Sequence, residues 1–410
     1  MRILVVTNFY PPVTFGGYET CCGLVVDRLR ERHDVRVLTS DHGAEQAPTE
    51  SWIWRRLPLF SGVSGDTLTA GLVTRRAIRE VRRALHESDP DLVFVWAGAR
   101  IPKGALRALE TCGVPLAFSI LDYWFDRPYD HDPFVRYLVG REKQARAVWS
   151  VATRVMNRLP SLRVDLSSAT PAAVCWCSET TRRLTSVSST IEPVLQETIH
   201  LATIHQRRLC AVQRKPDERT TILFVGRISR EKGPDVALRA LASLQRDHGI
   251  EARLVMCGPP APGIDRELRA LAEELDIAER VRMIGAVAAE PLAEMLGRAH
   301  VLLVPSTWQE PFGLVWLEGA LARVPLVASR TGGITEMLHE EQHALFFSTA
   351  DTTAAAAAIA RVLTQPVETA ARVSRAYARA KEFSIARYLD HSEAFVERAG
   401  ELLTRRGAPR

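Results

Sequence analysis

Long apolar runs are absent from this chain. No uninterrupted apolar segment approaches the roughly 18 residues of a membrane-spanning helix. The N-terminal stretch MRILVVTNF also lacks the cationic region, the longer apolar core and the cleavage site of a signal peptide. We therefore expect a cytoplasmic protein that contacts the inner face of a membrane at most peripherally.

A cysteine framework is missing as well. The seven cysteines make an odd number, and they include the adjacent Cys21 and Cys22 and the pair Cys175 and Cys177. None of them has cysteine or histidine partners at the spacing of a disulfide scaffold or a zinc site. The pattern favours a reducing compartment and predicts no metal site.

A strong charge of one sign is the third feature that the chain lacks. The formal net charge of +5 is small for 410 residues, so a nucleic-acid partner is not implied. Hydrophobic residues at 46% and charged residues at 25% are ordinary for a globular protein. The length predicts more than one domain, and we expect two.

Short apolar strands alternate with helical patterns along the first half. Each strand ends in a loop that leads into a helix, and this alternation predicts a parallel sheet with helices on both faces. The expected strands are 2–7, 35–39, 91–96, 115–120 and 172–178, and the expected helices are 20–32, one that contains 74–85, and a basic stretch over 130–160.

The alternation restarts after the polar segment Lys215–Thr220, which reads as the end of a linker. We predict an α/β protein with two Rossmann-like, doubly wound domains and a ligand bound between them at the carboxyl ends of the strands. The expected strands here are 221–226, 252–258, 281–285, 301–306 and 325–329, and the expected helices are 234–245, 265–275, 292–297, 310–322 and 349–363.

The segment EPFGLVWLE places Glu310 and Glu318 around the start of an expected helix. Pro311 suits a helix entry, and the amides of the next residues would face an anion such as phosphate. Glu318 shares an apolar stripe with Leu317 and its neighbours Leu314 and Leu321. A carboxylate there needs a buried partner or a ligand hydroxyl, such as those of a ribose. The alternative is that Glu310 is simply an acid in the first turn of the helix and that Glu318 lies in solvent at the edge of the stripe.

Two cations lie in the loop that follows the expected strand 221–226. Arg227 offers a planar fork of donors and Lys232 a point charge, which together suit a diphosphate. As an isolated feature the pair would be solvated surface. The glycine pairs Gly16–Gly17 and Gly332–Gly333 also follow strands, where they allow close approach of an anion or simply make turns.

These motifs together resemble a known family. The motifs are FYPPVTFGGYE near the N-terminus, FVGRISREKG, MCGPP, VRMIGAV, VLLVPSTWQEPFGLVWLEGALA and PLVASRTGGITEML. In this order and spacing they are similar to retaining nucleotide-sugar glycosyltransferases of the GT-B architecture, specifically glycosyltransferase family 4. The resemblance implies an acceptor-binding domain over 1–210, a nucleotide-sugar-binding domain over 211–385, and a C-terminal helix within 386–410 that packs back on the first domain.

The resemblance also implies roles for individual residues. Arg227 and Lys232 would bind the donor diphosphate and stabilise the leaving group. These two cations would do the work that a metal ion does in other enzymes, so the family needs no metal. Glu310 would contact the transferred sugar, and Glu318 would accept from the ribose hydroxyls. The catalytic set is then Arg227, Lys232, Glu310 and Asp122, and the donor-binding set is Gly16, Gly17, Gly258, Ile284, Phe312, Gly313, Leu314, Val315 and Glu318.

Two positions depart from the family pattern. Leu121 stands where a histidine is expected before Asp122, which removes a polar contact to the donor sugar. Glu197-Thr198-Ile199-His200 replaces the Asn-Gly-Ile-Asp linker pattern. The expected activity is transfer of a hexose-type sugar from a UDP or GDP donor to the hydroxyl of a glycan, a lipid-linked acceptor or a small molecule. The alternatives are a non-catalytic nucleotide-sugar-binding subunit and a GT-B epimerase or phosphorylase.

Five arginines lie on one expected helix, and they allow two interpretations. The arginines either bind anionic lipid at a membrane surface or form a solvated outer face of the helix. The solvated face is the favoured interpretation. The five arginines are Arg75, Arg76, Arg79, Arg82 and Arg83.

Overall fold

The computed structural model describes residues 1–14, 16–60, 67–125, 169–185 and 190–405. The chain forms two compact units, one made of Met1–His200 with Ala386–Arg410 and the other of Leu201–Ile385. The division thus falls earlier than the expected boundary after residue 210. The helical stretch expected over 130–160 lies outside the described residues. In the described part of the chain, no helix combines the length and the apolar character needed to cross a membrane.

The first unit is built on a parallel sheet. Its strands are β1 (Arg2–Thr7), β2 (Asp34–Ser40), β3 (Ile53–Leu57), β4 (Leu92–Ala97), β5 (Leu116–Ile120), β6 (Thr170–Trp176) and β7 (Ile191–Thr198). The order across this seven-stranded sheet is β3-β2-β1-β4-β5-β6-β7, and every pair is parallel. This is the predicted doubly wound topology.

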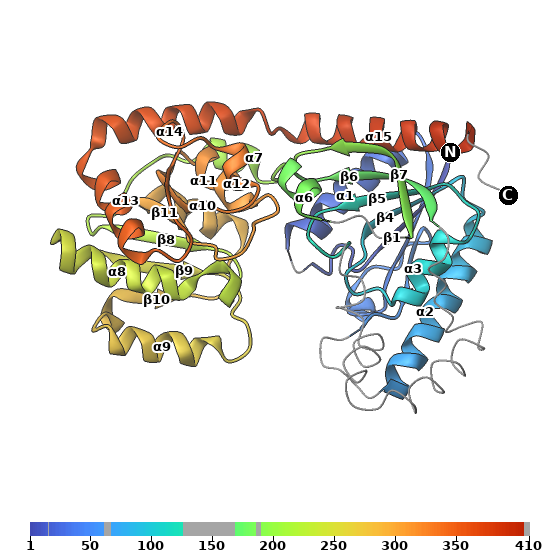
Figure 1. Cartoon of the computed structure of the whole chain (residues 1–410), viewed down its shortest axis with the longest axis horizontal. Helices are drawn as coiled ribbons and strands as arrows, with labels where there is room; N and C mark the ends of the chain where they lie inside the picture. Colours follow the sequence, from blue (N-terminus) through green and yellow to red (C-terminus); the bar gives the residue numbers. More distant parts are fainter. Residues whose placement is uncertain (15, 61–66, 126–168, 186–189, 406–410) are drawn as a thin grey trace. The chain divides into compact units, whose positions relative to one another are not determined.

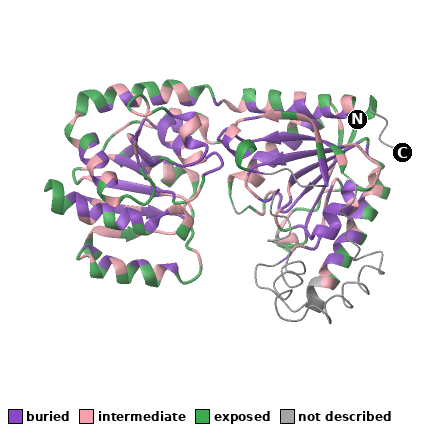
Figure 2. Cartoon of the chain, viewed as in Figure 1, coloured by how far each residue is buried: buried purple, intermediate pink, exposed green. Residues whose placement is uncertain are grey.

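Helices flank this sheet (Figure 1). They are α1 (Gly17–Arg30), η1 (Ala44–Gln46), α2 (Thr67–Ser88), α3 (Lys103–Glu110), α6 (Glu179–Leu184) and α15 (Ile385–Arg405). Side chains of α2 and α3 pack with those of β1, β4, β5 and β6 in one core cluster. Figure 2 colours these central strands as buried along most of their length.

The second unit repeats the arrangement with a six-stranded sheet. Its strands are β8 (Thr221–Val225), β9 (Arg253–Cys257), β10 (Val281–Met283), β11 (Val301–Val304), β12 (Leu326–Ser329) and β13 (Leu345–Phe347). The order is β10-β9-β8-β11-β12-β13, again with parallel pairs throughout. The predicted fold class, two parallel Rossmann-like sheets, is confirmed.

The helices of the second unit alternate with its strands as expected. They are α7 (Gln206–Cys210), η2 (Arg230–Lys232), α8 (Pro234–His248), α9 (Ile264–Glu274), η3 (Ala278–Arg280), α10 (Ala289–Arg298), α11 (Leu314–Leu321), α12 (Ile334–Met337), α13 (Thr352–Thr364) and α14 (Pro366–Lys381). The core between α8, α13 and the strands contains mainly leucine, isoleucine, valine and alanine side chains. Their close packing fixes the strand ends from which the site loops leave.

Ion pairs attach the last helix to the first unit. Glu393 of α15 is 5% exposed, and its carboxylate accepts from Arg28 at 2.9 Å and Arg32 at 3.3 Å. A second pair joins Arg398 to Glu197 of β7 at 2.6 Å. The predicted return of the C-terminal helix to the first domain is therefore confirmed.

Replacing Glu393 tests this attachment. Glu393→Ala leaves the guanidinium groups of Arg28 and Arg32 without their buried acceptor, so we expect the midpoint of thermal unfolding to fall by at least about 2 °C. Circular dichroism measures the midpoint. Glu401 is exposed on the same helix, and Glu401→Ala should leave the midpoint unchanged. An equal fall in both variants would contradict the assignment.

Candidate functional site

Three loops meet at the carboxyl edge of the second sheet. They follow β8, β11 and β12, which are neighbours in the strand order. The β8 loop carries Arg227 and Lys232, the β11 loop carries Glu310, and the β12 loop carries Gly332–Gly333. Parallel strands place their carboxyl ends together, so these residues converge as the sequence predicted.

The carboxylate of Glu310 is the centre of this convergence. It is 7% exposed and accepts from Nζ of Lys232 at 2.6 Å on Oε1 and 2.9 Å on Oε2. Oε2 also accepts from the Ser306 hydroxyl at 3.1 Å and from the Trp308 indole N–H at 2.8 Å. The hydrogen bonds from these donors satisfy the buried carboxylate and fix its orientation.

Trp308 contacts both members of the ion pair. Besides its hydrogen bond to Glu310, its ring lies with Nζ of Lys232 5.2 Å from the ring centroid. A cation over an indole face gains electrostatic attraction. The side chain of Lys232 retains 22% exposure, so its ammonium is still within reach of an anionic ligand.

Gly332–Gly333 hold the backbone of Glu310. The amide of Gly333 donates to the Glu310 carbonyl at 2.6 Å, and the amide of Gly332 donates to Oε1 of Gln309 at 2.8 Å. Gly332 has φ of 55°, and a Cβ there would lie 2.1 Å from the Glu310 carbonyl oxygen. Only glycine fits, because both the φ value and the close approach exclude a side chain.

The β8 loop approaches β11 equally closely. Gly233 follows η2 with φ of 68°, and a Cβ there would lie 2.0 Å from the Pro305 carbonyl oxygen. This contact places Lys232 beside the β11 loop. The absence of a side chain at Gly233 is thus a condition for the Lys232–Glu310 pair.

Arg227 is the exposed cation of the site. Its side chain is 59% exposed and pairs with Glu231 at 2.8 Å. Burial opposes ionisation of Glu231, but the Ser229 hydroxyl at 2.6 Å, a backbone amide and the charges of Arg227 and Lys232 prevail. The pKa of the Glu231 carboxyl is therefore held below its usual value.

Glu318 lies on α11 in a different environment. It is half-buried, and its Oε1 accepts from the Thr203 hydroxyl at 3.2 Å. Burial raises the pKa of the Glu318 carboxyl to about 7, although the Thr203 hydrogen bond opposes the shift. Leu317 and Leu321 of the predicted stripe are fully buried, whereas Leu314 is half-buried. Glu318 is therefore at the margin of the core and has a protein partner.

The start of α11 differs from the expectation. The helix begins at Leu314, not at Pro311, because Gly313 with φ of 76° serves as its N-cap. Phe312 is buried at 2% exposure and packs against Trp316 and Phe383. The amides of Leu314 and Val315 belong to the first turn, where a helix has no internal acceptor for them. Anion binding at this end of α11 stays a prediction.

Gly258 and Ile284 lie at the ends of neighbouring strands. The amide of Gly258 donates to the Gly285 carbonyl at 2.8 Å, and that of Ile284 donates to the Met256 carbonyl at 3.0 Å. Gly258 has φ of 146°, and a Cβ there would lie 1.9 Å from the Gly226 carbonyl oxygen. The loops after β8, β9 and β10 are therefore packed backbone against backbone.

The remaining predicted residues belong to the first unit. Gly16 caps α1, which starts at Gly17, and its amide donates to Oε2 of Glu19 at 3.0 Å. Asp122 follows β5, and its Oδ1 accepts from the Trp124 amide at 3.0 Å. Leu121 is buried at 3% exposure. An apolar side chain therefore occupies the position where the family pattern has a histidine.

Sequence reasoning missed Ser306, Trp308 and Thr203. Ser306 and Trp308 stand within the PSTWQEPFG motif, close enough to Glu310 to be suspected. Thr203 had no such signal, because it is far from Glu318 in sequence and follows the altered linker pattern.

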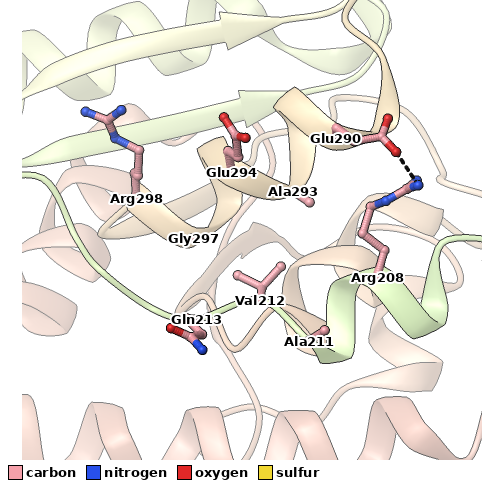
Figure 3. A pocket seen from close by; sticks show the side chains of 9 residues that line it. All are labelled: Arg208, Ala211, Val212, Gln213, Glu290, Ala293, Glu294, Gly297 and Arg298. Carbon is pink, nitrogen blue, oxygen red and sulfur yellow. Dashed lines mark ion pairs between the residues drawn. The ribbon is translucent and has the colours of Figure 1, made fainter.

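Two further features lie apart from the predicted residues. A cavity of about 530 Å³ opens between α7 and α10, and Figure 3 shows its lining with the Arg208–Glu290 ion pair at one end. None of the predicted site residues lines it. In the described residues, His33, Glu393 and Glu397 also have metal-ligand spacing. Their carboxylates already pair with arginines, which disfavours a cation there.

Two Rossmann-like sheets with site loops at the carboxyl edge define the GT-B class of fold. Residues 206–380 match the model described as glycosyl transferases group 1, and residues 16–165 match a glycosyl transferase 4-like domain. An uncharacterised glycosyltransferase of Methanocaldococcus jannaschii is 33% identical over 363 residues, covering 84% of this chain and 85% of that one. The chain belongs to the glycosyl transferases group 1 family, which confirms the predicted resemblance.

Other curated relatives match over shorter stretches. The D-inositol 3-phosphate glycosyltransferase of Saccharomonospora viridis is 38% identical over 181 residues, which is 43% of this chain. The match spans 42% of that relative's length.

Solved structures share the fold over nearly the whole chain. HepE of Anabaena in complex with UDP-glucose has a TM-score of 0.64 at 19% identity and covers 98% of this chain and 99% of its own. Sucrose-phosphate synthase of Thermosynechococcus elongatus has a TM-score of 0.68 at 16% identity, with 99% of each chain covered.

Substitution of Gly332 tests the support of Glu310. Gly332 and Gly249 both have positive φ, but a Cβ at Gly249 meets no atom within 4 Å. Gly249→Ala should cost about 1–2 kcal/mol from φ alone. We expect Gly332→Ala to cost roughly 1–3 kcal/mol more, because its Cβ meets the Glu310 backbone. Urea denaturation measures both, and equal costs would contradict the role of Gly332.

The raised pKa of Glu318 predicts a pH-dependent stability. Its folded pKa is about 7 against an ordinary value of 4.5. The unfolded chain releases the proton first, so this group lowers the free energy of unfolding as pH rises across that interval. Glu318→Gln removes the effect. We expect the variant to match the parent near about pH 4 and to be more stable by about 1–3 kcal/mol at about pH 8. A pH-independent difference in urea denaturation would contradict this.

Proposed function

We propose that the protein transfers a hexose-type sugar from a nucleoside diphosphate to an acceptor hydroxyl, with retention at the anomeric carbon and without a metal ion. The observation that carries the proposal is the oriented Lys232–Glu310 pair beside Arg227 at the carboxyl edge of the second sheet. In a family of glycosyltransferases, this is where a sugar diphosphate would meet both cations and a fixed carboxylate.

Each charged group has a distinct part in the proposed reaction. Arg227 and Lys232 stabilise the negative charge that grows on the departing phosphate. Glu310, fixed by its donors, faces the sugar, and Glu318 accepts from the ribose hydroxyls. The bond between the anomeric carbon and the phosphate oxygen breaks, the acceptor oxygen bonds to that carbon, and the acceptor proton leaves with the phosphate. Positioning and charge stabilisation supply most of the rate.

UDP is the proposed nucleotide. HepE of Anabaena, which shares the fold, is described in complexes with UDP and with UDP-glucose. The backbone of Ile284 and the tight loop at Gly258 are the proposed neighbours of the base. Gly16 and Gly17 are further proposed donor-binding residues, and Asp122 is a further proposed catalytic residue.

We further propose that the protein works in the cytoplasm and contacts the inner face of a membrane peripherally. Arg75, Arg79 and Arg82 of α2 are exposed, and none of them forms an ion pair within the part of the chain that the structure describes. Such a face attracts anionic lipid. A lipid-linked acceptor would give this contact a purpose.

A specific observation favours a second candidate. The buried Leu121 offers no polar contact where the family pattern has histidine. A nucleotide-sugar-binding subunit without catalysis would tolerate this change. Incubation with a panel of nucleotide sugars, with and without hydroxyl acceptors, separates the two. Acceptor-dependent release of nucleotide supports the transferase, and binding without release across the panel supports the subunit.

Single substitutions in the β8 loop test the diphosphate assignment. We expect Arg227→Ala and Lys232→Ala each to lower turnover at least about tenfold, which corresponds to about 1.4 kcal/mol of barrier. Arg230 is the matched control, since it lies in the same loop but pairs with Glu267 at 2.7 Å and is 79% exposed. Arg230→Ala should leave turnover within about twofold. Unchanged rates for both Arg227→Ala and Lys232→Ala would refute the assignment.

A further inference from the structure

Thr203 lies on the segment that leads from β7 into α7. Although this segment has no regular structure, Leu201, Ala202 and Thr203 are all buried, with Thr203 at 3% exposure. The Thr203 hydroxyl accepts from the backbone amide of His205 at 3.3 Å and lies 3.2 Å from Oε1 of Glu318. A hydroxyl has one proton. Because an ionised carboxylate can only accept, that proton is directed at Oε1 of Glu318.

The carboxylate of Glu318 can accept further hydrogen bonds. A carboxylate has about four acceptor positions over its two oxygens. In the described residues Thr203 is the protein donor to this carboxylate, and it bonds to Oε1. Oε2 therefore remains for a ligand. A pair of vicinal hydroxyls, as in a ribose, supplies the donors that a half-buried carboxylate otherwise lacks.

We propose that Thr203 is a positioning residue of the donor site, whose hydroxyl orients the Glu318 carboxylate to accept the two ribose hydroxyls of a nucleoside diphosphate. The inference rests on the proposed function, because it takes Glu318 as the ribose acceptor. Its new content is that the segment entering the second unit takes part in donor recognition. Nothing in the expected motif set includes this residue.

The electrostatic surroundings of Glu318 support this role. Cys257, at the end of β9, interacts with the carboxylate, and burial together with Glu318 raises the pKa of its thiol to about 11. The thiol is therefore neutral at physiological pH. The helix α11 carries no other charged residue. On the helices packed against α11, Arg208 of α7 pairs with Glu290, and Arg372 and Arg379 of α14 pair with Glu341 and Glu382.

Loss of the Thr203 hydroxyl should therefore raise the pKa of the Glu318 carboxyl further. The hydrogen bond opposes the rise in the pKa of Glu318 that burial causes. Without it the carboxyl protonates at higher pH. A protonated carboxyl accepts less well from ribose, so nucleotide affinity should fall most at neutral pH and recover in alkaline buffer.

The experiment compares two ligands across pH by isothermal titration calorimetry on the full chain. UDP carries both ribose and diphosphate, whereas inorganic pyrophosphate carries the charge alone. We expect Thr203→Val to weaken UDP binding about tenfold at pH 7, to shift the pH of half-maximal affinity upward, and to leave pyrophosphate binding unchanged. Thr203→Ser should restore UDP affinity. If Thr203→Val does not fold, Thr203→Ala takes its place.

A separate variant distinguishes failure of this inference from failure of the proposed function. Glu318→Gln should weaken UDP but not pyrophosphate if Glu318 meets the ribose. If that holds and Thr203→Val binds UDP as the parent does at every pH, the role of Thr203 is refuted alone. Equal weakening of UDP and pyrophosphate by Thr203→Val would also overturn it, because that indicates general distortion. No effect of Glu318→Gln on UDP would overturn the ribose assignment and this inference together.

Discussion

The bond between the Lys232 ammonium and the Glu310 carboxylate depends on three adjacent parallel strands. Lys232 follows β8, Glu310 follows β11, and the glycines that hold the Glu310 backbone follow β12. The pair neutralises itself in the buried part of the site. Arg227 is 59% exposed and pairs with Glu231 of the same loop. The two cations of one loop therefore have different carboxylate partners, the half-buried Glu231 and the buried Glu310.

The sequence predicted the centre of the first sheet better than its edges. Central strands such as β1 and β4 are buried on both faces and read as continuous apolar runs. The edge strands β3 and β7 were missed because they are half exposed and carry arginines and glutamates. The beginning of α11 was misplaced for a different reason. Pro311 is a good helix starter, but Gly313 adopts a left-handed φ that delays the helix.

The site was predictable as a set of positions and not as a set of contacts. Strand ends and glycine pairs located Lys232, Glu310 and Gly332 at one edge. Spacing does not give side-chain direction, so the bonds from Lys232 and Trp308 to Glu310 could not be foreseen. Thr203 had no recognisable pattern. Its contact arises because an irregular segment is buried and directs its single hydroxyl proton at Glu318.

The attachment of α15 to the first unit has a consequence for how the chain folds. The first unit consists of Met1–His200 and Ala386–Arg410, while the second is the continuous stretch Leu201–Ile385. On a ribosome the second unit is therefore finished before the first can receive its last helix. Until then Arg28 and Arg32 lack the Glu393 carboxylate. The first unit is thus the last to be completed, although its first strand is the first to be made.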